Sequence, residues 1–380
     1  MKRRTFIKSA AFLSVANALP AMSKTTLSCT TEGESTANYQ TSIVIVSDLH
    51  ISNDKLLNEF ESALQNMTQH HNINAIIIPG DIGEDLNFIE KTVSATIRYF
   101  NNKKAIVILG NHDVRGPDSD TWVKDPKASN PYYKHVMEKY VQLNAQWVKH
   151  VPGHACFDEW IDGHHFIALN TDRGLKDQAF FDKNTLKWLE EKLNENTQGK
   201  KKFVIVHQSL DDTHWRANLF GGFGEQDKKI KGILSRHPDT FIISGHIHNG
   251  FGVLEAIQRT YGTLVETPSF NRTENGLIEK GYGFIMRIGD DTVLFEAWNF
   301  LKNKHYPEYD IRIDNQTVNY LLKEKTDECI NNALSEEYPW AEIAKKNNGG
   351  DDITESQAHF GLRQLWPTYQ WDFYKRKAIE

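Results

Sequence analysis

The chain has 380 residues, of which 25% are charged and 11% aromatic. This composition is ordinary for one large globular domain or for two or three smaller ones, and it excludes a wholly disordered chain. Lys and Arg number 44 against 50 Asp and Glu, a formal net charge of −6, so the chain has no general attraction to nucleic acid or to an anionic membrane. Three cysteines exclude a disulfide-dense scaffold. Sixteen histidines are more notable, because imidazole is the commonest side-chain metal ligand.

The first 28 residues have the composition of an export signal. They contain basic residues and no acid, and a weakly apolar stretch at 10–19 precedes small residues that suit a signal peptidase. The segment RRTFIK at residues 3–8 resembles the twin-arginine signal, although Lys2 stands where Ser or Thr is usual. We therefore predict a signal peptide at residues 1–28 and a periplasmic or extracellular protein. An ordinary secretory signal and a lipid anchor at Cys29 are the alternatives.

Residues 29–40 are small and polar, as in a linker, and a regular alternation of strands and helices begins at residue 41. Continuous Val/Ile runs predict strands that are buried on both faces, in a sheet covered by helices. The predicted strands are 43–46, 75–78, 105–109, 166–169, 203–206 and 241–243. Apolar residues at helical spacing predict helices at 55–70, 88–100 and 185–194.

Other segments carry weaker signals. Residues 114–155 contain four prolines and are predicted to be irregular, as a long functional loop would be. Asp162-Gly163 between short apolar runs predicts a hairpin, and the shorter runs within 251–298 predict antiparallel strands. Polar, helix-like and then aromatic sequence predicts an appended extension at 301–380. No later segment has the roughly 20 apolar residues that a membrane helix needs.

Polar side chains follow the ends of five predicted strands. In an open α/β sheet, residues beyond the carboxyl ends of strands line the ligand crevice, so these side chains should meet at one place. Alternate residues of an extended segment point the same way, and a glycine before three of the clusters allows a tight exit from the strand. The clusters are Asp48 and His50, then Asp81, then Asn111, His112 and Asp113, then His207, and finally His246 and His248.

These side chains are the types that hold two metal ions. Carboxylate, amide oxygen and imidazole suit borderline or hard ions, and one carboxylate must bridge two ions held about 3.5–4 Å apart. We assign one ion to Asp48, His50, Asp81 and His248, and the other to Asp81, Asn111, His207 and His246, with Asp81 as the bridge. This leaves His112 beside the site, where it can act on the substrate. The residue types do not choose among Fe, Mn and Zn, as divalent or trivalent ions.

The order and spacing of the five clusters resemble those of the calcineurin-like metallophosphoesterase superfamily, over residues 41–300. The resemblance implies an α/β fold of four layers, in which two packed mixed β-sheets are flanked by helices. It also implies hydrolysis of a phosphomonoester or phosphodiester by a metal-bridging hydroxide. His112 would protonate the leaving group or stabilise its charge, Asp113 would orient His112, and Arg115 would contact phosphate. Purple acid phosphatases carry Tyr where this chain has Glu84, so a purple iron site is not expected.

The sequence leaves the substrate open. A small-molecule phosphoester is the expected partner, and the acidic balance disfavours a nuclease. A cyclic-nucleotide or phospholipid-headgroup phosphodiesterase is one alternative, and a non-catalytic binding module that keeps the fold is another. Whether Cys156 and Cys329 pair, what residues 301–380 do, and whether the chain forms oligomers also stay open.

Overall fold

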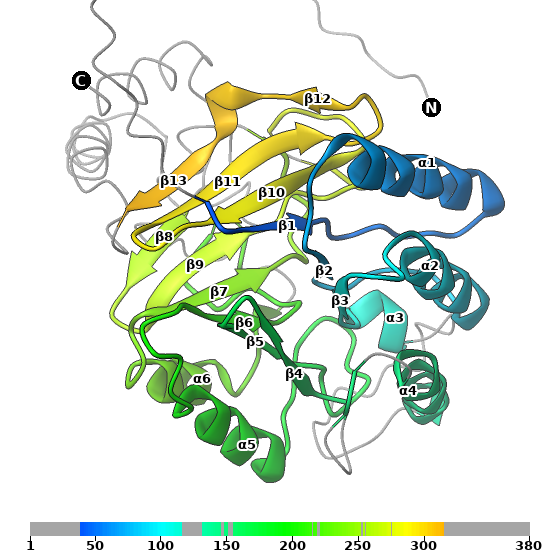
Figure 1. The fold of residues 1–380 in the computed structure, drawn as a ribbon. Helices are drawn as coiled ribbons and strands as arrows, with labels where there is room; N and C mark the ends of the chain where they lie inside the picture. The colour runs from blue at the N-terminus through cyan, green and yellow to red at the C-terminus, as the bar shows by residue number, and fades with distance from the viewer. Residues whose placement is uncertain are drawn as a thin grey trace, which may run out of the picture. The chain divides into compact units, whose positions relative to one another are not determined.

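Thirteen β-strands in two sheets carry the described part of the computed structural model (Figure 1). The structure describes residues 39–115, 131–145, 148–150, 155–214, 216–218, 221–251, 254, 256–274 and 276–314. The strands of the first sheet are β1 (Thr41–Ile45), β2 (Ala75–Ile78), β3 (Lys104–Val107), β10 (Tyr282–Ile288), β11 (Thr292–Asn299), β12 (Lys304–His305) and β13 (Ile311–Asp314). Their order is β12-β11-β10-β1-β2-β3, and β13 also pairs with β11.

The second sheet has six strands among the described residues, in the order β4-β5-β6-β7-β9-β8. These strands are β4 (Phe157–Ile161), β5 (His164–Ala168), β6 (Lys202–Ile205), β7 (Thr240–Ser244), β8 (Ala256–Arg259) and β9 (Gly262–Glu266). Both sheets are mixed. The parallel strands are β1, β2 and β3 in the first sheet and β5, β6, β7 and β9 in the second, and antiparallel strands flank them.

The helices in the described part of the chain are α1 (Asp54–His70), α2 (Leu86–Tyr99), α3 (Asn111–Arg115), α4 (Pro131–Asn144), α5 (Lys183–Leu193) and α6 (Asp227–Leu234), with a short 3-10 helix at Pro307–Tyr309. Helices α1 and α2 each begin at a capping side chain. Asn53 accepts a hydrogen bond from the backbone N–H of Leu56, and Asp85 accepts one from that of Phe88. Such caps satisfy N–H groups that have no partner within the helix.

The layers follow from the alternation of side chains along the strands. In β1, Ile43 and Ile45 enter a core that they share with second-sheet residues such as Phe203 and Phe241. Val44, on the opposite face, packs in a second core with α1 and α2. A third core joins the outer face of the second sheet to α5 and α6. The order is therefore helices, sheet, sheet, helices (Figure 1), which confirms the predicted four-layer α/β fold.

The turn between β4 and β5 is the hairpin predicted at Asp162-Gly163. Both residues have a positive φ, of 50° and 83° respectively. A two-residue turn with positive φ at both positions matches the twist of the strands that it joins. The register pairs Ile161 with His164, directly across this turn.

Three features differ from the sequence-based expectations. Part of the segment 114–155, predicted to be irregular, forms helix α4, which begins at Pro131, a position where proline costs no helical hydrogen bond. Helix α6 lies in a region for which no helix was predicted. The first sheet also continues past residue 300, the predicted end of the catalytic domain, because β12 and β13 both pair with β11. Residues 304–305 and 311–314 are therefore strands of the first sheet.

Several expectations concern parts of the chain outside the described residues. These are the signal peptide at 1–28, Cys29, most of the linker at 29–40 and the extension beyond residue 314, with Cys329. The described residues all fall in the larger of two compact units, which begins at Ala37. Within these described ranges, no helix combines the length and apolar character needed to cross a membrane.

Candidate metal centre

The seven predicted metal ligands come together where strands of both sheets end. Each follows the carboxyl end of β1, β2, β3, β6 or β7. Pairing continues past the strand ends, because the N–H of Asp48 donates to the carbonyl of Gly80 (3.2 Å) and that of His50 donates to the carbonyl of Asp81 (2.9 Å). On the second sheet, the N–H of Gly245 donates to the carbonyl of His207 (3.0 Å). These links place the polar side chains at one common edge.

The first cluster consists of Asp48, His50, Asp81 and His248, whose ligand atoms all lie within 4.8 Å of one another. The Nε2 atoms of His50 and His248 are 3.0 Å apart. His50 Nε2 lies 3.5 Å from Asp81 Oδ2, and His248 Nε2 lies 3.5 Å from Asp48 Oδ1. Two imidazole nitrogens and two carboxylates that face one point are a donor set that suits Zn, Fe or Mn.

The second cluster consists of Asn111, His207 and His246 together with Asp81. Asn111 Oδ1 lies 3.1 Å from His207 Nε2 and 3.0 Å from His246 Nδ1. His207 Nε2 lies 3.3 Å from Asp81 Oδ1. Asp81, Asn111 and His207 are buried, and His246 is partly buried. This cluster therefore has the composition predicted for the second ion.

Asp81 belongs to both clusters, with one carboxylate oxygen directed to each. Its Oδ1 faces His207 and also accepts a hydrogen bond from the backbone N–H of His112 (2.9 Å). Its Oδ2 faces His50, is buried and has no hydrogen-bond partner. Burying an ionised oxygen without a partner is costly, so a cation is the group that fits there. The residues thus fit a dinuclear centre in which Asp81 is the bridge.

Two of the histidines are oriented by carboxylates outside the clusters. His50 Nδ1 lies 2.9 Å from Glu84 Oε1, and His248 Nδ1 lies 3.0 Å from Glu274 Oε1. A neutral imidazole that donates its Nδ1–H to a carboxylate presents its Nε2 lone pair on the opposite side. Such carboxylate–histidine pairs are usual around metal sites, where they set the tautomer and raise ligand basicity.

The second cluster is oriented by backbone carbonyls. His207 Nδ1 lies 2.7 Å from the carbonyl oxygen of Pro79, which leaves Nε2 to face Asn111 and Asp81. The amide nitrogen of Asn111 donates to the carbonyl of Lys176 (3.0 Å), so its Oδ1 points into the cluster. Every one of these contacts turns an acceptor atom toward the same point, as a cation requires.

The electrostatics of the site favour positive charge. Burial lowers the pKa of His50 and of His246, which keeps both imidazoles in the neutral form that binds metals. Burial also opposes the charged form of His207, but the Asp81 carboxylate outweighs it and raises the pKa of His207 to about 9. The pKa of Glu84 lies below its ordinary value, because its contacts with His112 and His50 outweigh the opposing effect of burial.

The backbone reaches this arrangement through strain. Five of the seven predicted ligands have a positive φ, which non-glycine residues rarely adopt. They are Asp48 (54°), His50 (44°), Asp81 (51°), His246 (79°) and His248 (55°). The sequence pattern predicts a regular extended segment for Asp48 and His50. Their positive φ angles contradict this prediction, although their side chains still meet. Strain of this kind persists only where the surrounding structure holds it, and it concentrates at functional sites.

Gly110 is required by close approach, because a side chain there would enter the metal centre. A Cβ atom at this position would lie 2.1 Å from Asp81 Oδ1 and 2.7 Å from His207 Nε2. We expect Gly110→Ala to lower both metal content and phosphoester turnover at least about tenfold, since small displacements of reacting groups can cost about a hundredfold.

Gly232 is the matched control for this prediction. It lies in α6, and a Cβ atom there would meet nothing within 4 Å. Gly232→Ala should keep full metal content and turnover and should raise the free energy of unfolding by about 0.5–1 kcal/mol. Metal analysis, turnover and urea unfolding on both variants measure these effects. Normal metal content in the Gly110 variant would contradict the prediction.

Asp113 does not orient His112, contrary to the sequence-based expectation. Its buried carboxylate accepts hydrogen bonds from the backbone N–H groups of Ile82 (3.0 Å), Gly83 (2.8 Å) and Gly110 (2.7 Å). It therefore ties the loop after β2 to the loop after β3. The physical reason is that Asp113 lies one residue further along helix α3 than His112, and adjacent helical side chains diverge.

Asp113→Ala should consequently destabilise the fold. The substitution leaves three buried N–H groups without an acceptor, and each such group costs about 1–3 kcal/mol. We expect the free energy of unfolding in urea to fall by about 3 kcal/mol or more. Asp290→Ala, which removes an exposed carboxylate that pairs with Lys200 at 3.3 Å, should change it by less than about 1 kcal/mol. Equal stability of the two variants would contradict this role for Asp113.

His112 contacts two other side chains through Nδ1. Arg115 Nη2 lies 2.7 Å away and Glu84 Oε2 lies 3.3 Å away. A guanidinium can only donate, so the shorter contact makes Nδ1 an acceptor and places the proton of the neutral ring on Nε2. The His112 ring centroid is 4.6 Å from that of His50, which keeps His112 beside the first cluster.

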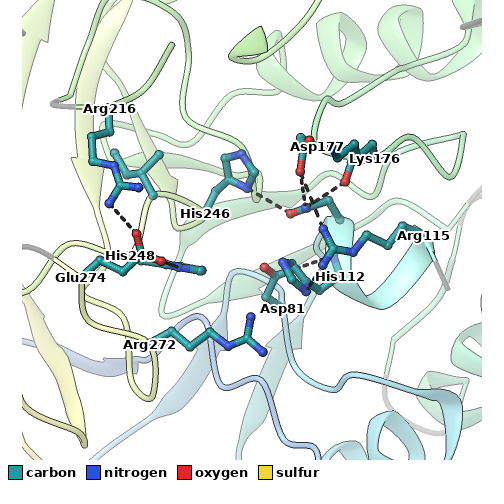
Figure 2. A pocket seen from close by; sticks show the side chains of 12 residues that line it. Asp81, His112, Arg115, Lys176, Asp177, Arg216, His246, His248, Arg272 and Glu274 are labelled. Atoms are coloured by element: carbon teal, nitrogen blue, oxygen red, sulfur yellow. Dashed lines mark hydrogen bonds and ion pairs between the residues drawn. The ribbon is translucent and has the colours of Figure 1, made fainter. Parts of the chain in front are cut away.

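A pocket of about 240 Å³ opens onto the clusters (Figure 2). Asp81, Asn111, His112, His246 and His248 form its inner wall. The remaining lining residues are Arg115, Lys176, Asp177, Arg216, Ile247, Arg272 and Glu274. The lining includes four cationic side chains and three carboxylates, those of Asp81, Asp177 and Glu274, so positive charge exceeds negative charge by one.

Sequence reasoning missed several of these residues. Glu84 drew notice only as a departure from the purple acid phosphatase pattern, yet it contacts His50, His112 and Arg272. Glu274 and Arg272 lie on the loop between β9 and β10, and Arg216 follows β6. Their polar character alone does not distinguish them from ordinary loop residues, so only the fold shows that they reach the pocket.

One solved structure shares this fold. A purple acid phosphatase, PPD1, from yellow lupin (Lupinus luteus) has a TM-score of 0.50 and 12% sequence identity, and the match covers 72% of this chain. The chain spans only 53% of the lupin protein. A 5'-nucleotidase from Candida albicans matches with a TM-score of 0.36 and 12% identity, over 90% of this chain and 59% of its own.

The sequence itself assigns the family. No curated protein matches the chain in a sequence search. The family model for the calcineurin-like phosphoesterases matches residues 41–250, more than half of the chain, and spans all seven predicted ligands. The chain therefore belongs to the calcineurin-like phosphoesterase family.

Proposed function

We propose that the protein is an exported metal-dependent phosphoesterase that hydrolyses a small phosphomonoester or phosphodiester at the two clusters joined by Asp81. The observation that carries this proposal is the position of Asp81, whose two oxygens face one cluster each while the buried Oδ2 has no hydrogen-bond partner. Asp48, His50 and His248 would complete the ligands of one ion, and Asn111, His207 and His246 those of the other. The donor set would suit Fe, Mn or Zn.

When bound, two such ions would supply Lewis-acid charge that polarises the phosphoryl group and activates the attacking water. Two divalent ions would carry more positive charge than the Asp48 and Asp81 carboxylates cancel. The loaded site would therefore be locally positive and attract an anionic phosphoryl group. Arg115 lines the pocket and would bind a phosphoryl oxygen, because the planar guanidinium matches phosphate geometry.

His112 would protonate the leaving oxygen or stabilise its charge. It lines the pocket, belongs to neither donor set, and carries its proton on Nε2 because Nδ1 accepts from Arg115. Asn111 precedes His112 on α3, so the ligand and the acid share one rigid element. A group placed within hydrogen-bond reach of the leaving oxygen typically contributes about 10²–10⁴-fold to the rate.

Export is supported by the sequence of residues 1–28 alone. We propose that this segment is a signal peptide, that the catalytic domain starts near residue 41, and that the mature protein acts in the periplasm or outside the cell. Fractionation of cells that express the full chain tests this, with a variant in which Arg3 and Arg4 are both lysine. Retention of that variant inside the cell would support the twin-arginine route, and unchanged export would contradict it.

The hydrolase proposal is tested on the purified chain. Metal analysis should find two ions of the Fe, Mn or Zn type, and turnover of an aryl phosphomonoester should be compared with that of a bis-aryl phosphodiester. Activity on one of them that chelator removes and metal restores would support the proposal. Lack of turnover with every one of these metals loaded would contradict it and favour a binding module. Preference for a cyclic nucleotide or a phospholipid headgroup would identify the narrower alternatives.

A further inference from the structure

Two arginines on the pocket wall are each joined to a carboxylate that orients the first cluster. Arg216 Nη1 lies 2.6 Å from Glu274 Oε2, and Arg272 Nη2 lies 2.6 Å from Glu84 Oε1. Both pairs engage the guanidinium through a single amino group. Glu274 contacts His248 through its other carboxylate oxygen, Oε1. Glu84 contacts His50 through Oε1, the same oxygen that binds Arg272. The arginines are thus fixed relative to the metal centre without contacting its ligands.

Each guanidinium keeps most of its donors. An arginine has five N–H donors in a planar fork that matches phosphate and carboxylate geometry. Within the described part of the chain, neither the Arg216 nor the Arg272 side chain makes a second hydrogen bond. Both residues line the pocket.

Arg216 and Arg272 both approach the pocket from the side of His248, and the Arg272 guanidinium extends below Asp81 and His112 (Figure 2). In Figure 2 they flank His248 and Glu274, whereas Arg115 lies toward the opposite side. The Arg216 side chain is 15% exposed and that of Arg272 is 43% exposed, so the pair lines the pocket from its partly buried wall to its rim. Arg216 has a φ of 69°, a strained conformation of the kind that persists at functional sites.

We propose that Arg216 and Arg272 bind a second anionic group of the substrate, a phosphate or a carboxylate carried by the part of the molecule that is not the hydrolysed phosphoryl group. This inference rests on the proposed function, which places the hydrolysed group between the two clusters. Arg115 then serves that phosphoryl group, and Arg216 and Arg272 serve its substituent.

Non-hydrolysable phosphonates test this on the metal-loaded full chain. Isothermal titration calorimetry compares phenylphosphonate, 4-carbamoylphenylphosphonate, 4-carboxyphenylphosphonate and 1,4-phenylenebisphosphonate. The carbamoyl compound has nearly the shape of the carboxylate but no second charge. We expect the charged compounds to bind about 10–100-fold more tightly than the carbamoyl compound, the range for hydrogen bonds to a charged group. The stronger of the two charged compounds identifies the preferred anion.

Substitutions of the two arginines test whether these side chains cause the preference for a second anionic group. Arg216→Gln and Arg272→Gln should reduce this preference several-fold each while phenylphosphonate affinity and metal content stay near wild type. Arg216→Lys and Arg272→Lys should retain part of it, because they keep the charge and lose the planar fork. Arg98→Gln is the matched control, since Arg98 is an exposed surface residue that pairs with Glu61 at 2.7 Å. It should leave every affinity unchanged.

Three results would overturn the proposal. One is equal binding of the charged and carbamoyl compounds by the wild-type protein. Another is an equal loss of affinity for phenylphosphonate and for the charged compounds in the Arg216 and Arg272 variants, which would show that the arginines only hold Glu274 and Glu84. The third is failure of every phosphonate to bind, together with absence of aryl phosphate turnover, which would contradict the proposed function as well.

Discussion

Replacement of Asp81 by alanine is expected to remove most of the bound metal and to abolish phosphoester turnover. Among the residues that the structure describes, Asp81 alone has oxygens facing both clusters, at 3.5 Å from His50 Nε2 and 3.3 Å from His207 Nε2. Losing the bridge leaves each remaining donor set incomplete. Charge stabilisation by the ions is worth several kcal/mol, and about 1.4 kcal/mol is a factor of ten, so turnover should fall about a thousandfold or more.

Metal analysis and turnover on the same preparation check this prediction. Asp81→Asn keeps the side-chain shape and removes the negative charge, so it separates loss of ligation from loss of packing. Asp54→Ala is the surface control, because Asp54 is exposed and pairs with Lys91 on the neighbouring helix α2 at 2.9 Å. The control should retain metal and activity. Full metal content with normal turnover in the Asp81 variants would exclude the bridging role.

Replacement of His112 by alanine is expected to reduce turnover by about 10²–10⁴-fold while metal content stays unchanged. His112 lines the pocket and is in neither assigned donor set, although it forms a further group of possible ligands with His50 and Glu84. Its removal therefore takes away a proton donor and no assigned ligand. The loss should be largest for an alkyl phosphate. It should be smaller for a nitrophenyl phosphate, because nitrophenolate is a good leaving group that needs little protonation.

The dependence on the leaving group distinguishes an acid from a structural residue. A structural defect would lower turnover of both substrates by the same factor and would change the metal content. His70→Ala, at the exposed end of α1, serves as the control and should behave as wild type. Intact turnover of the alkyl phosphate by the His112 variant would rule out the acid role.

Much of the fold was predictable because its strands are buried on both faces. A strand such as β2, Ala75–Ile78, needs apolar residues at every position, and that run is visible in the sequence. The elements that were missed have weaker local patterns. Helix α4 is preceded and begun by prolines that also suit a loop, and β13 is a short edge strand that exists because it pairs with β11.

The predicted ligands were recognisable because each follows a strand whose end is marked by apolar sequence. Asp113 shows the limit of that reasoning. Its place beside His112 in the sequence suggested that it orients His112, yet its carboxylate binds three backbone N–H groups from two other loops. Neighbours in a helix point apart, whereas partners in space come from distant segments.

The sequence by itself determined the residue types at the strand ends, the family and the presence of enough oxygen and nitrogen donors for two metal ions. Only the tertiary structure decided which donors face which cluster, that Glu84 and Glu274 orient two of the histidines, and that Arg216 and Arg272 line the same pocket. The reason is that strand ends are set by local apolar patterns, whereas contacts such as that between His50 and His248, 198 residues apart, depend on how the two sheets pack.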